Sequence, residues 1–159
     1  MTRIFEDDIE QLAIQELEKL GYHYLHGPDI APDGDYPERE SYSEVVLANR
    51  LKHSIDRLNP KIPEDARQDA WRQVQRLTST DLLTNNEQFH SMLTEGVKVN
   101  YIQNGSIRGD LVWLVDFSDY ANNEFLVVNQ FTVIEDTRNK RPDIVLFVNG
   151  MPFVVIELK

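Results

Sequence analysis

The first twenty residues repeat apolar side chains at helical intervals. Between Ile4 and Leu20 the apolar positions lie three and four residues apart, and they include Phe5, Ile9, Leu12, Ala13 and Leu17. This spacing predicts an amphipathic helix that buries one face. Lys19 and Gly21 are typical of the last turn and the end of such a helix. A short strand is expected next, from Tyr22 to Leu25, and then a loop rich in Gly, Pro and Asp up to Glu40.

Glu10 lies at the edge of the apolar stripe of this helix. At helical spacing it neighbours Ile14 and Leu17, so its carboxylate can point either into solvent or toward a site. The solvated position is the commoner one for these residues alone, because glutamate is seldom buried without a partner. Both positions stay open at this point.

Three further helices are expected between residues 41 and 96. The sequence Ser41–Glu44 has the form of a capping box and predicts the start of the first, which ends at Asn59–Pro60. Pro63, followed by two acidic residues, predicts the start of the second. The third is expected from about Asn86 to Glu95. Together they are predicted to form a helical layer.

From Val97 onward the apolar pattern changes from helical to strand-like. The run Leu111–Val115 is apolar on both faces, which indicates a central sheet covered by helices. The order of the elements therefore predicts an α/β fold in which the sheet occupies about residues 97–159. The expected strands are rich in Val, Ile, Phe and Trp: Val97–Tyr101, Leu111–Phe117, Phe125–Ile134, Ile144–Val148 and Phe153–Lys159.

The composition is that of an ordinary globular domain. The chain has 159 residues, of which 41% are hydrophobic and 27% charged, and it contains no cysteine. A chain of this size can bury a core without staples, and disulfide or thiolate metal sites are excluded. No apolar run approaches the roughly 18 residues of a membrane span, and the N-terminus lacks the apolar segment of a signal peptide. A single domain in the cytoplasm is therefore expected.

The formal net charge of −11 limits the possible partners. A domain that held a nucleic-acid backbone by itself would present a basic face. If this chain acts on nucleic acid, other domains or subunits are expected to supply most of the affinity. An acidic site would then need divalent cations to admit a phosphate.

Two groups of polar residues have metal-binding chemistry without the matching spacing. Asp29, Asp33 and Asp35 do not follow the pattern of an EF-hand loop, so a solvated loop is the better interpretation. His23 and His26 are close in sequence but have no further ligand nearby, and surface histidines are the better interpretation for them.

The last nineteen residues combine two apolar runs with charged ends. Asp143 precedes the first run, and Glu157 and Lys159 end the second. Residues two apart on a strand point to the same face, so Glu157 and Lys159 are expected to project together. Charged groups at the ends of apolar strands are costly unless they are paired or bind a metal.

Whether Asp143 joins Glu157 depends on the turn between the two runs. A strict two-residue hairpin at Asn149-Gly150 would place Asp143 opposite Ile156 and on the wrong face. Shifting the pairing by one residue places Asp143 directly opposite Glu157. An odd-length turn or a bulge near Pro152, which lacks an N–H for the ladder, is therefore predicted.

Two carboxylates in this arrangement can share Mg²⁺, which prefers oxygen ligands. The cation would polarise a phosphodiester and acidify a bound water, and Lys159 would hold that water or offset charge on the phosphorus oxygens. The plainer interpretation is that Asp143 caps a turn while Glu157 and Lys159 are ordinary polar residues at the end of a buried strand.

These residues carry a resemblance to a known family. Pro142-Asp143, thirteen intervening residues and Glu157-Leu158-Lys159 resemble the PD-(D/E)xK nuclease signature. The whole phrase from Arg141 to Lys159 closely resembles the N-terminal nuclease domain of the R (restriction and translocation) subunit of type I restriction enzymes. Weaker similarity extends to Asn129–Val133 and to most of the chain.

The resemblance implies a restriction-endonuclease-like core with a central mixed β-sheet flanked by helices. It also implies Mg²⁺-dependent cleavage of double-stranded DNA, with Asp143, Glu157 and Lys159 as the catalytic set and Asp143 and Glu157 as metal ligands. Related nucleases often bring a glutamate from the first helix toward the metal, and Glu10 is the matching position. The implied partners are DNA and the modification and specificity subunits of the restriction complex.

Two family elements are absent from residues 1–159. These are the Gln-x-x-x-Tyr element and the ATP-driven helicase motor, since no G-x-x-x-x-G-K-[ST] loop occurs. The chain is therefore expected to be the leading, C-terminally truncated endonuclease domain of a larger subunit, which uses ATP only through its helicase domains. Cleavage by the isolated fragment is not expected.

Two other functions stay open. The first is an inactive nuclease-fold scaffold or docking domain in a helicase-like protein. The second is a small acidic interaction module whose carboxylates bind no metal. The presence of Asp143, Glu157 and Lys159 together argues against both.

Overall fold

The computed structural model describes residues 5–77 and 82–159. The chain divides into two compact units. The first contains the residues up to Ala48 together with Glu124–Lys159, and the second contains Asn49–Asn123.

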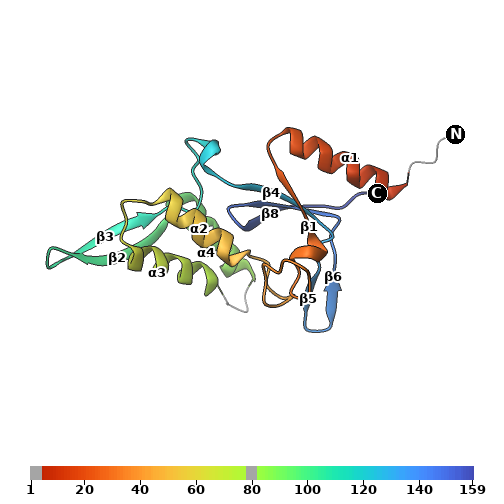
Figure 1. Ribbon diagram of the computed structural model, residues 1–159. Helices are drawn as coiled ribbons and strands as arrows, with labels where there is room; N and C mark the ends of the chain where they lie inside the picture. Colours follow the sequence, from red (N-terminus) through yellow and green to blue (C-terminus); the bar gives the residue numbers. More distant parts are fainter. Residues whose placement is uncertain (1–4, 78–81) are drawn as a thin grey trace. The chain divides into compact units, whose positions relative to one another are not determined.

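The first unit is built on a four-stranded mixed sheet (Figure 1). Its strand order is β1-β4-β7-β8, with β1 parallel to β4 and the other neighbours antiparallel. The helix α1 lies across β1 and β4. A small antiparallel sheet of β5 and β6 follows β4. The elements are α1 (Glu6–Lys19), β1 (His23–His26), the 3-10 helix η1 (Gly27–Ile30), β4 (Phe125–Asn129), β5 (Val133–Glu135), β6 (Arg138–Lys140), β7 (Ile144–Val148) and β8 (Met151–Ile156).

The second unit combines three helices with a two-stranded antiparallel sheet of β2 and β3. Asn59, which follows α2, ties two parts of this unit together, because its side chain donates to the carbonyl oxygen of Trp113 and accepts from the Trp113 N–H, both at 2.8 Å. The elements are α2 (Ala48–Leu58), α3 (Glu64–Gln75), α4 (Leu82–Glu95), β2 (Val97–Gln103), β3 (Ser106–Val112) and the 3-10 helix η2 (Tyr120–Asn122).

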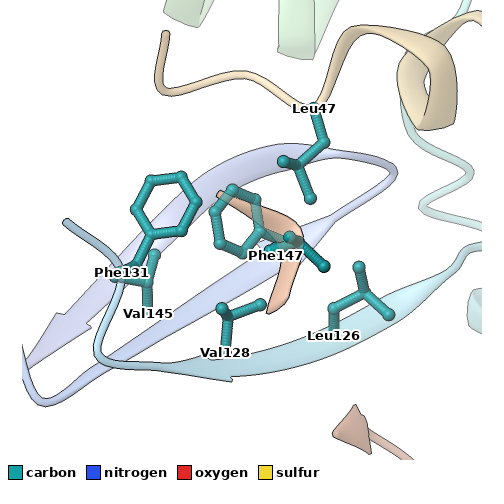
Figure 2. Packing of buried hydrophobic residues seen from close by; sticks show 7 residues of the cluster. Leu47, Leu126, Val128, Phe131, Val145 and Phe147 are labelled. Carbon is teal, nitrogen blue, oxygen red and sulfur yellow. The ribbon is translucent and has the colours of Figure 1, made fainter. Parts of the chain in front are cut away.

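Apolar clusters cover both faces of the four-stranded sheet. On the α1 face, Ile14 packs with Val127, Ile144 and Leu146. The opposite face is covered by η1 and the segment that leads to α2, and the rings of Phe131 and Phe147 meet edge-on at 5.2 Å. Strand alternation separates the two sets, because neighbouring residues of β4 and β7 point to opposite faces. The second cluster contains Ile30, Leu47, Leu126, Val128, Phe131, Val145 and Phe147 (Figure 2).

The α/β class and the central mixed sheet are confirmed, but one predicted grouping is wrong. The residues from Val97 to Val112 form their own two-stranded sheet and do not pair with the four-stranded one. A hairpin of adjacent strands satisfies its hydrogen bonds locally, and the apolar pattern alone does not say which sheet a strand joins. The prediction that residues 1–159 form one domain stays a prediction.

Several predicted element boundaries also need correction. The helix expected from Ser41 begins at Ala48. The polar side chains before it bond locally instead, since Ser41 Oγ accepts from the Ser43 N–H at 3.2 Å and Glu44 Oε2 accepts from the Glu40 N–H at 3.1 Å. The strand expected up to Phe117 ends at Val112. Ile4, where the first helix was expected to begin, lies outside the described residues.

The strand predicted from Phe125 to Ile134 is also interrupted. β4 ends at Asn129, because Gln130 adopts a left-handed conformation with a φ of 52°. Within the described residues, no helix is long and apolar enough to cross a membrane.

Gly27 lets η1 pack closely against the backbone at the end of β4. A Cβ at this position would lie 2.2 Å from the Asn129 carbonyl oxygen and 2.7 Å from that of Gln130. Both contacts are with backbone, so the clash cannot be relieved by a side-chain rotation. We expect Gly27→Ala to lower the free energy of unfolding by about 1–3 kcal/mol, measured by hydrogen exchange of the β4 and β7 amides.

Gly109→Ala is the matched control. The nearest neighbour of its added Cβ is the tip of the Asn100 side chain at 3.3 Å, so the change in the stability of β2 and β3 should stay within about 0.5 kcal/mol. Equal exchange rates in Gly27→Ala and the parent chain would contradict the prediction.

Candidate active site

The hairpin of β7 and β8 contains the predicted bulge. Asn149 and Gly150 form a two-residue turn with φ angles of 52° and 81°, which are typical of a type I′ turn. Beyond it, Phe147 pairs with Pro152 but Leu146 pairs with Val154, so Phe153 has no partner on β7. The register therefore shifts by one residue at the position adjacent to Pro152, as the sequence predicted.

This shift places Asp143 opposite Glu157. The last observed pair is Ile144 with Ile156, and one further step along both strands gives Asp143 and Glu157. Ile156 and Leu158 pack toward the cluster on the α1 face. By alternation, Glu157 and Lys159 belong to the opposite face, where they are exposed.

The Asp143 carboxylate is fixed by the backbone of the neighbouring strand. Its Oδ2 accepts a hydrogen bond from the Leu158 N–H at 2.7 Å. Asp143 is half-buried, and a short bond from a backbone amide to a carboxylate is stronger than one between neutral groups. The bond ties the start of β7 to the Glu157-Leu158-Lys159 segment.

Glu10 is buried, so the solvated interpretation of this residue is wrong. Its side chain is 8% exposed. Glu10 Oε1 accepts from Asn129 Nδ2 and Glu10 Oε2 accepts from Gln130 Nε2, both at 2.7 Å. Two neutral amides thus hold this carboxylate at the end of β4.

The Asn129 amide is itself held in one orientation. Its Oδ1 accepts from the Tyr24 hydroxyl at 3.0 Å and lies 3.1 Å from His26 Nδ1. Burial raises the pKa of the Tyr24 hydroxyl, which therefore stays protonated and donates. Since Asn129 Oδ1 can only accept, we assign the proton to Nδ1 of His26. The Nδ2 group of Asn129 is thereby directed at Glu10.

Gln130 connects this network to Asp143. Its side chain donates to Glu10, and its backbone N–H donates to the Asp143 carbonyl oxygen at 3.0 Å. The structure thus brings Asp143 and Glu157 together by register and joins Glu10 to Asp143 through one residue. Among residues 5–77 and 82–159, however, no group of three or more His, Asp and Glu side chains is arranged to hold a metal ion.

Sequence reasoning gave no role to the residues that hold Glu10. Asn129 and Gln130 entered only through the family resemblance, while Tyr24 and His26 had no assigned contact. One sequence feature could have indicated their role: the apolar run Phe125–Val128 is followed directly by two residues with amide side chains, Asn129 and Gln130. A buried amide at a strand end needs a polar partner, but the sequence does not say that this partner comes from α1.

Comparison with known proteins gives consistent matches. The sequence profile of the family described as type I restriction enzyme R protein N terminus matches residues 4–159. The type I restriction enzyme HindI endonuclease subunit of Haemophilus influenzae is 40% identical over 155 residues, which is 97% of this chain and 15% of the relative. The putative type I restriction enzyme MjaIXP endonuclease subunit of Methanocaldococcus jannaschii is 39% identical over 154 residues, covering 95% of this chain and 15% of the relative.

The chain spans about 15% of the length of each of these two relatives. The family profile nevertheless covers all but the first three residues of the chain. The chain therefore belongs to the family of N-terminal regions of type I restriction enzyme R subunits.

Proposed function

We propose that this chain carries the nuclease site of a type I restriction R subunit and hydrolyses phosphodiester bonds of double-stranded DNA with Mg²⁺. The supporting observation is the bulge-dependent register, which sets Asp143 opposite Glu157 with Lys159 on the same face as Glu157. Three groups of matching chemistry thus converge at one end of an apolar hairpin.

The donor chemistry fits Mg²⁺. Asp143 and Glu157 offer carboxylate oxygens, which are the ligands this cation prefers, and Mg²⁺ sites commonly use one or two carboxylates with several waters. The absence of a three-residue cluster among the described residues is compatible with such a site. When bound, the cation would polarise the phosphodiester and lower the pKa of a coordinated water.

The protein groups around Asp143 have separate tasks in this proposal. The Leu158 N–H holds one carboxylate oxygen of Asp143 and so orients the other. Glu157 supplies the second carboxylate. Lys159 is exposed and can donate a hydrogen bond to a phosphate oxygen, offsetting the negative charge that grows there during hydrolysis.

Glu10 is the third carboxylate of the proposal. Asn129 and Gln130 satisfy its oxygens without neutralising its charge. Alternation along β4 places its partner Asn129 on the α1 face, across the sheet from Asp143 and Glu157. Glu10 therefore adds negative charge at the same end of the sheet, which favours a cation there. We keep Glu10 as a candidate metal-site residue that acts together with Asp143 and Glu157.

The remaining functions belong to the rest of the proposed complex. With a net charge of −11, the chain is not suited to hold DNA alone. We propose that the specificity and modification subunits supply sequence recognition, and that helicase domains outside residues 1–159 use ATP. The proposed setting is the cytoplasm, where these partners meet DNA.

Substitutions at the hairpin test the assignment. We expect Asp143→Asn and Lys159→Ala to reduce plasmid cleavage by the assembled enzyme about 100-fold or more, because the first weakens a carboxylate ligand of Mg²⁺ and the second removes the charge that offsets the phosphate. The measurement is single-turnover cleavage with Mg²⁺ and ATP. The controls are Lys98→Ala on β2 and Asp7→Asn on α1, whose side chains are exposed, and both should cleave like the parent.

Translocation-linked ATP hydrolysis should be unchanged in all four variants. Cleavage at the parental rate in both Asp143→Asn and Lys159→Ala would refute the nuclease assignment and favour an inactive docking domain.

A double-mutant cycle tests the Glu10 network. Because the Glu10–Asn129 hydrogen bond is charged and buried, the cycle of Glu10→Ala and Asn129→Ala should give a coupling free energy of about 1.5–3 kcal/mol. The measurement is hydrogen exchange of the β4 amides.

The exposed pair Glu64 and Gln68, joined at 3.1 Å on α3, is the control. Its coupling, read from the α3 amides, should be about 0.2–0.5 kcal/mol. A Glu10–Asn129 value within the control range would show that the two side chains do not interact as described.

A further inference from the structure

A cavity of about 330 Å³ lies in the first unit, beside the candidate active site. It has polar and apolar walls contributed by η1, the loop after it and the chain on either side of the β5–β6 hairpin. No function described above uses it. Its lining includes Gly27, Asp33, Tyr42, Gln130, Thr132 and Arg141.

The cavity is connected to Asp143 through one of its lining residues. Gln130 lines it and donates its N–H to the Asp143 carbonyl oxygen. Arg141, on the far side of the hairpin, is two residues before Asp143. Gly27 packs directly against the backbone of Asn129 and Gln130, so the cavity wall is fixed to the end of β4.

The cavity lies at the end of the sheet where β4 ends and β7 begins. Gln130 and Thr132 line it directly after β4, and Arg141 lines it two residues before Asp143. Alternation along β7 assigns Asp143 to the face of Val145, and the register assigns Glu157 to that face too. A strand of DNA over this end of the sheet would therefore pass close to both places.

Arg141 offers a cation that the protein does not use. It is exposed, and within the described residues it makes no hydrogen bond or ion pair. An arginine can hold a phosphate through two parallel N–H donors. The neighbouring Thr132 adds a hydroxyl of the kind that commonly contacts DNA phosphates.

A second guanidinium lies behind the cavity. Arg39 is 4% exposed, and its charge lies 3.9 Å from the Phe131 ring and 5.5 Å from the ring of Tyr42, which lines the cavity. Burial lowers the pKa of Arg39, but an arginine stays charged at neutral pH. Its Nε and Nη2 have no hydrogen-bond partner within the described residues. Its Nη1 donates to the Glu44 carbonyl oxygen at 3.0 Å, and the Glu44 carboxylate offsets part of its charge.

One carboxylate also lines the cavity, but it is already engaged. Asp33 accepts a hydrogen bond from the Tyr42 hydroxyl, whose pKa this bond raises. Among the residues that line the cavity, Arg141 and Asp33 carry opposite charges. Because Tyr42 engages Asp33, Arg141 is the charged group left for an anionic ligand.

The exposed strand β6, which precedes Arg141, carries two further basic side chains. Arg138 and Lys140 lie on it, next to Arg141 in the sequence. Glu135 and Asp136 at the turn offset part of this charge.

We propose that this cavity binds a backbone phosphate of the DNA duplex next to the phosphodiester that is cut. Arg141 is the main contact and Thr132 a second donor. The inference rests on the proposed nuclease function and adds a substrate-binding site to it. Such a site positions the duplex over Asp143 and Glu157 without reading its sequence, because phosphate contacts carry no base information.

Photocrosslinking tests DNA proximity independently of catalysis. The assembled enzyme carries Lys159→Ala, so that DNA stays intact, and p-azidophenylalanine replaces exposed Asn139 on β6. We expect crosslinks to labelled DNA under cleavage conditions. The same label at Ile107, which is 79% exposed on β3, is the comparison, and crosslinking from position 139 that does not exceed it overturns the proposal.

The second arm measures the phosphate contact itself. Arg141→Gln should lower single-turnover cleavage about tenfold or more, because it removes a charged hydrogen bond. It should also reduce the slope of log rate against log salt by about one, as expected for one lost phosphate contact. Arg141→Lys should recover part of the rate, and Arg108→Gln on exposed β3 should match the parent.

The outcomes separate this inference from the nuclease assignment. If Lys159→Ala abolishes cleavage while Arg141→Gln keeps the parental rate and salt slope, the phosphate site is wrong and the nuclease assignment stands. If Lys159→Ala cleaves normally, the nuclease assignment fails, and the crosslink from position 139 still reports whether DNA contacts this face.

Discussion

The hydrogen-bond register between β7 and β8 is the constraint on which the candidate site depends. Side chains alternate along a strand, so a register without this shift would move Glu157 and Lys159 to the α1 face and bring Ile156 opposite Asp143. The unpaired Phe153 prevents this arrangement. The tight Asn149-Gly150 turn and the displaced catalytic register are therefore compatible only because one residue is left out of the ladder.

A second constraint acts at the end of β4, where the burial of Glu10 must be compensated. The Asn129 and Gln130 amides provide two hydrogen bonds, and the left-handed Gln130 turns the chain out of the strand while keeping its N–H on Asp143. A carboxylate satisfied by neutral donors keeps its negative charge in a partly desolvated place. Burying such a carboxylate is costly unless hydrogen bonds compensate it, and these two amides supply that compensation.

The sequence predicted those parts of the structure that are local. Helical spacing located α1 and α3, and the turn chemistry together with Pro152 located the bulge and so the partner of Asp143. It failed where the outcome depends on distant partners. Val97–Val112 has strand character but no signal for its sheet. The pattern left Glu10 open between solvent and a site, because its amide partners are about 120 residues away. The Ser41 hydroxyl accepts a hydrogen bond from the Ser43 N–H in its own loop and does not cap a helix.

The charge distribution bears on the proposed DNA substrate. In the proposed function, Glu10, Asp143 and Glu157 would repel a bare phosphate, so binding at this end of the sheet would need a cation. At the neighbouring cavity, the exposed Arg141 offers a cationic side chain to a phosphate. With a net charge of −11 the chain is not suited to hold DNA alone, so the proposed cleavage would depend on the rest of a restriction complex to bring a duplex to this face.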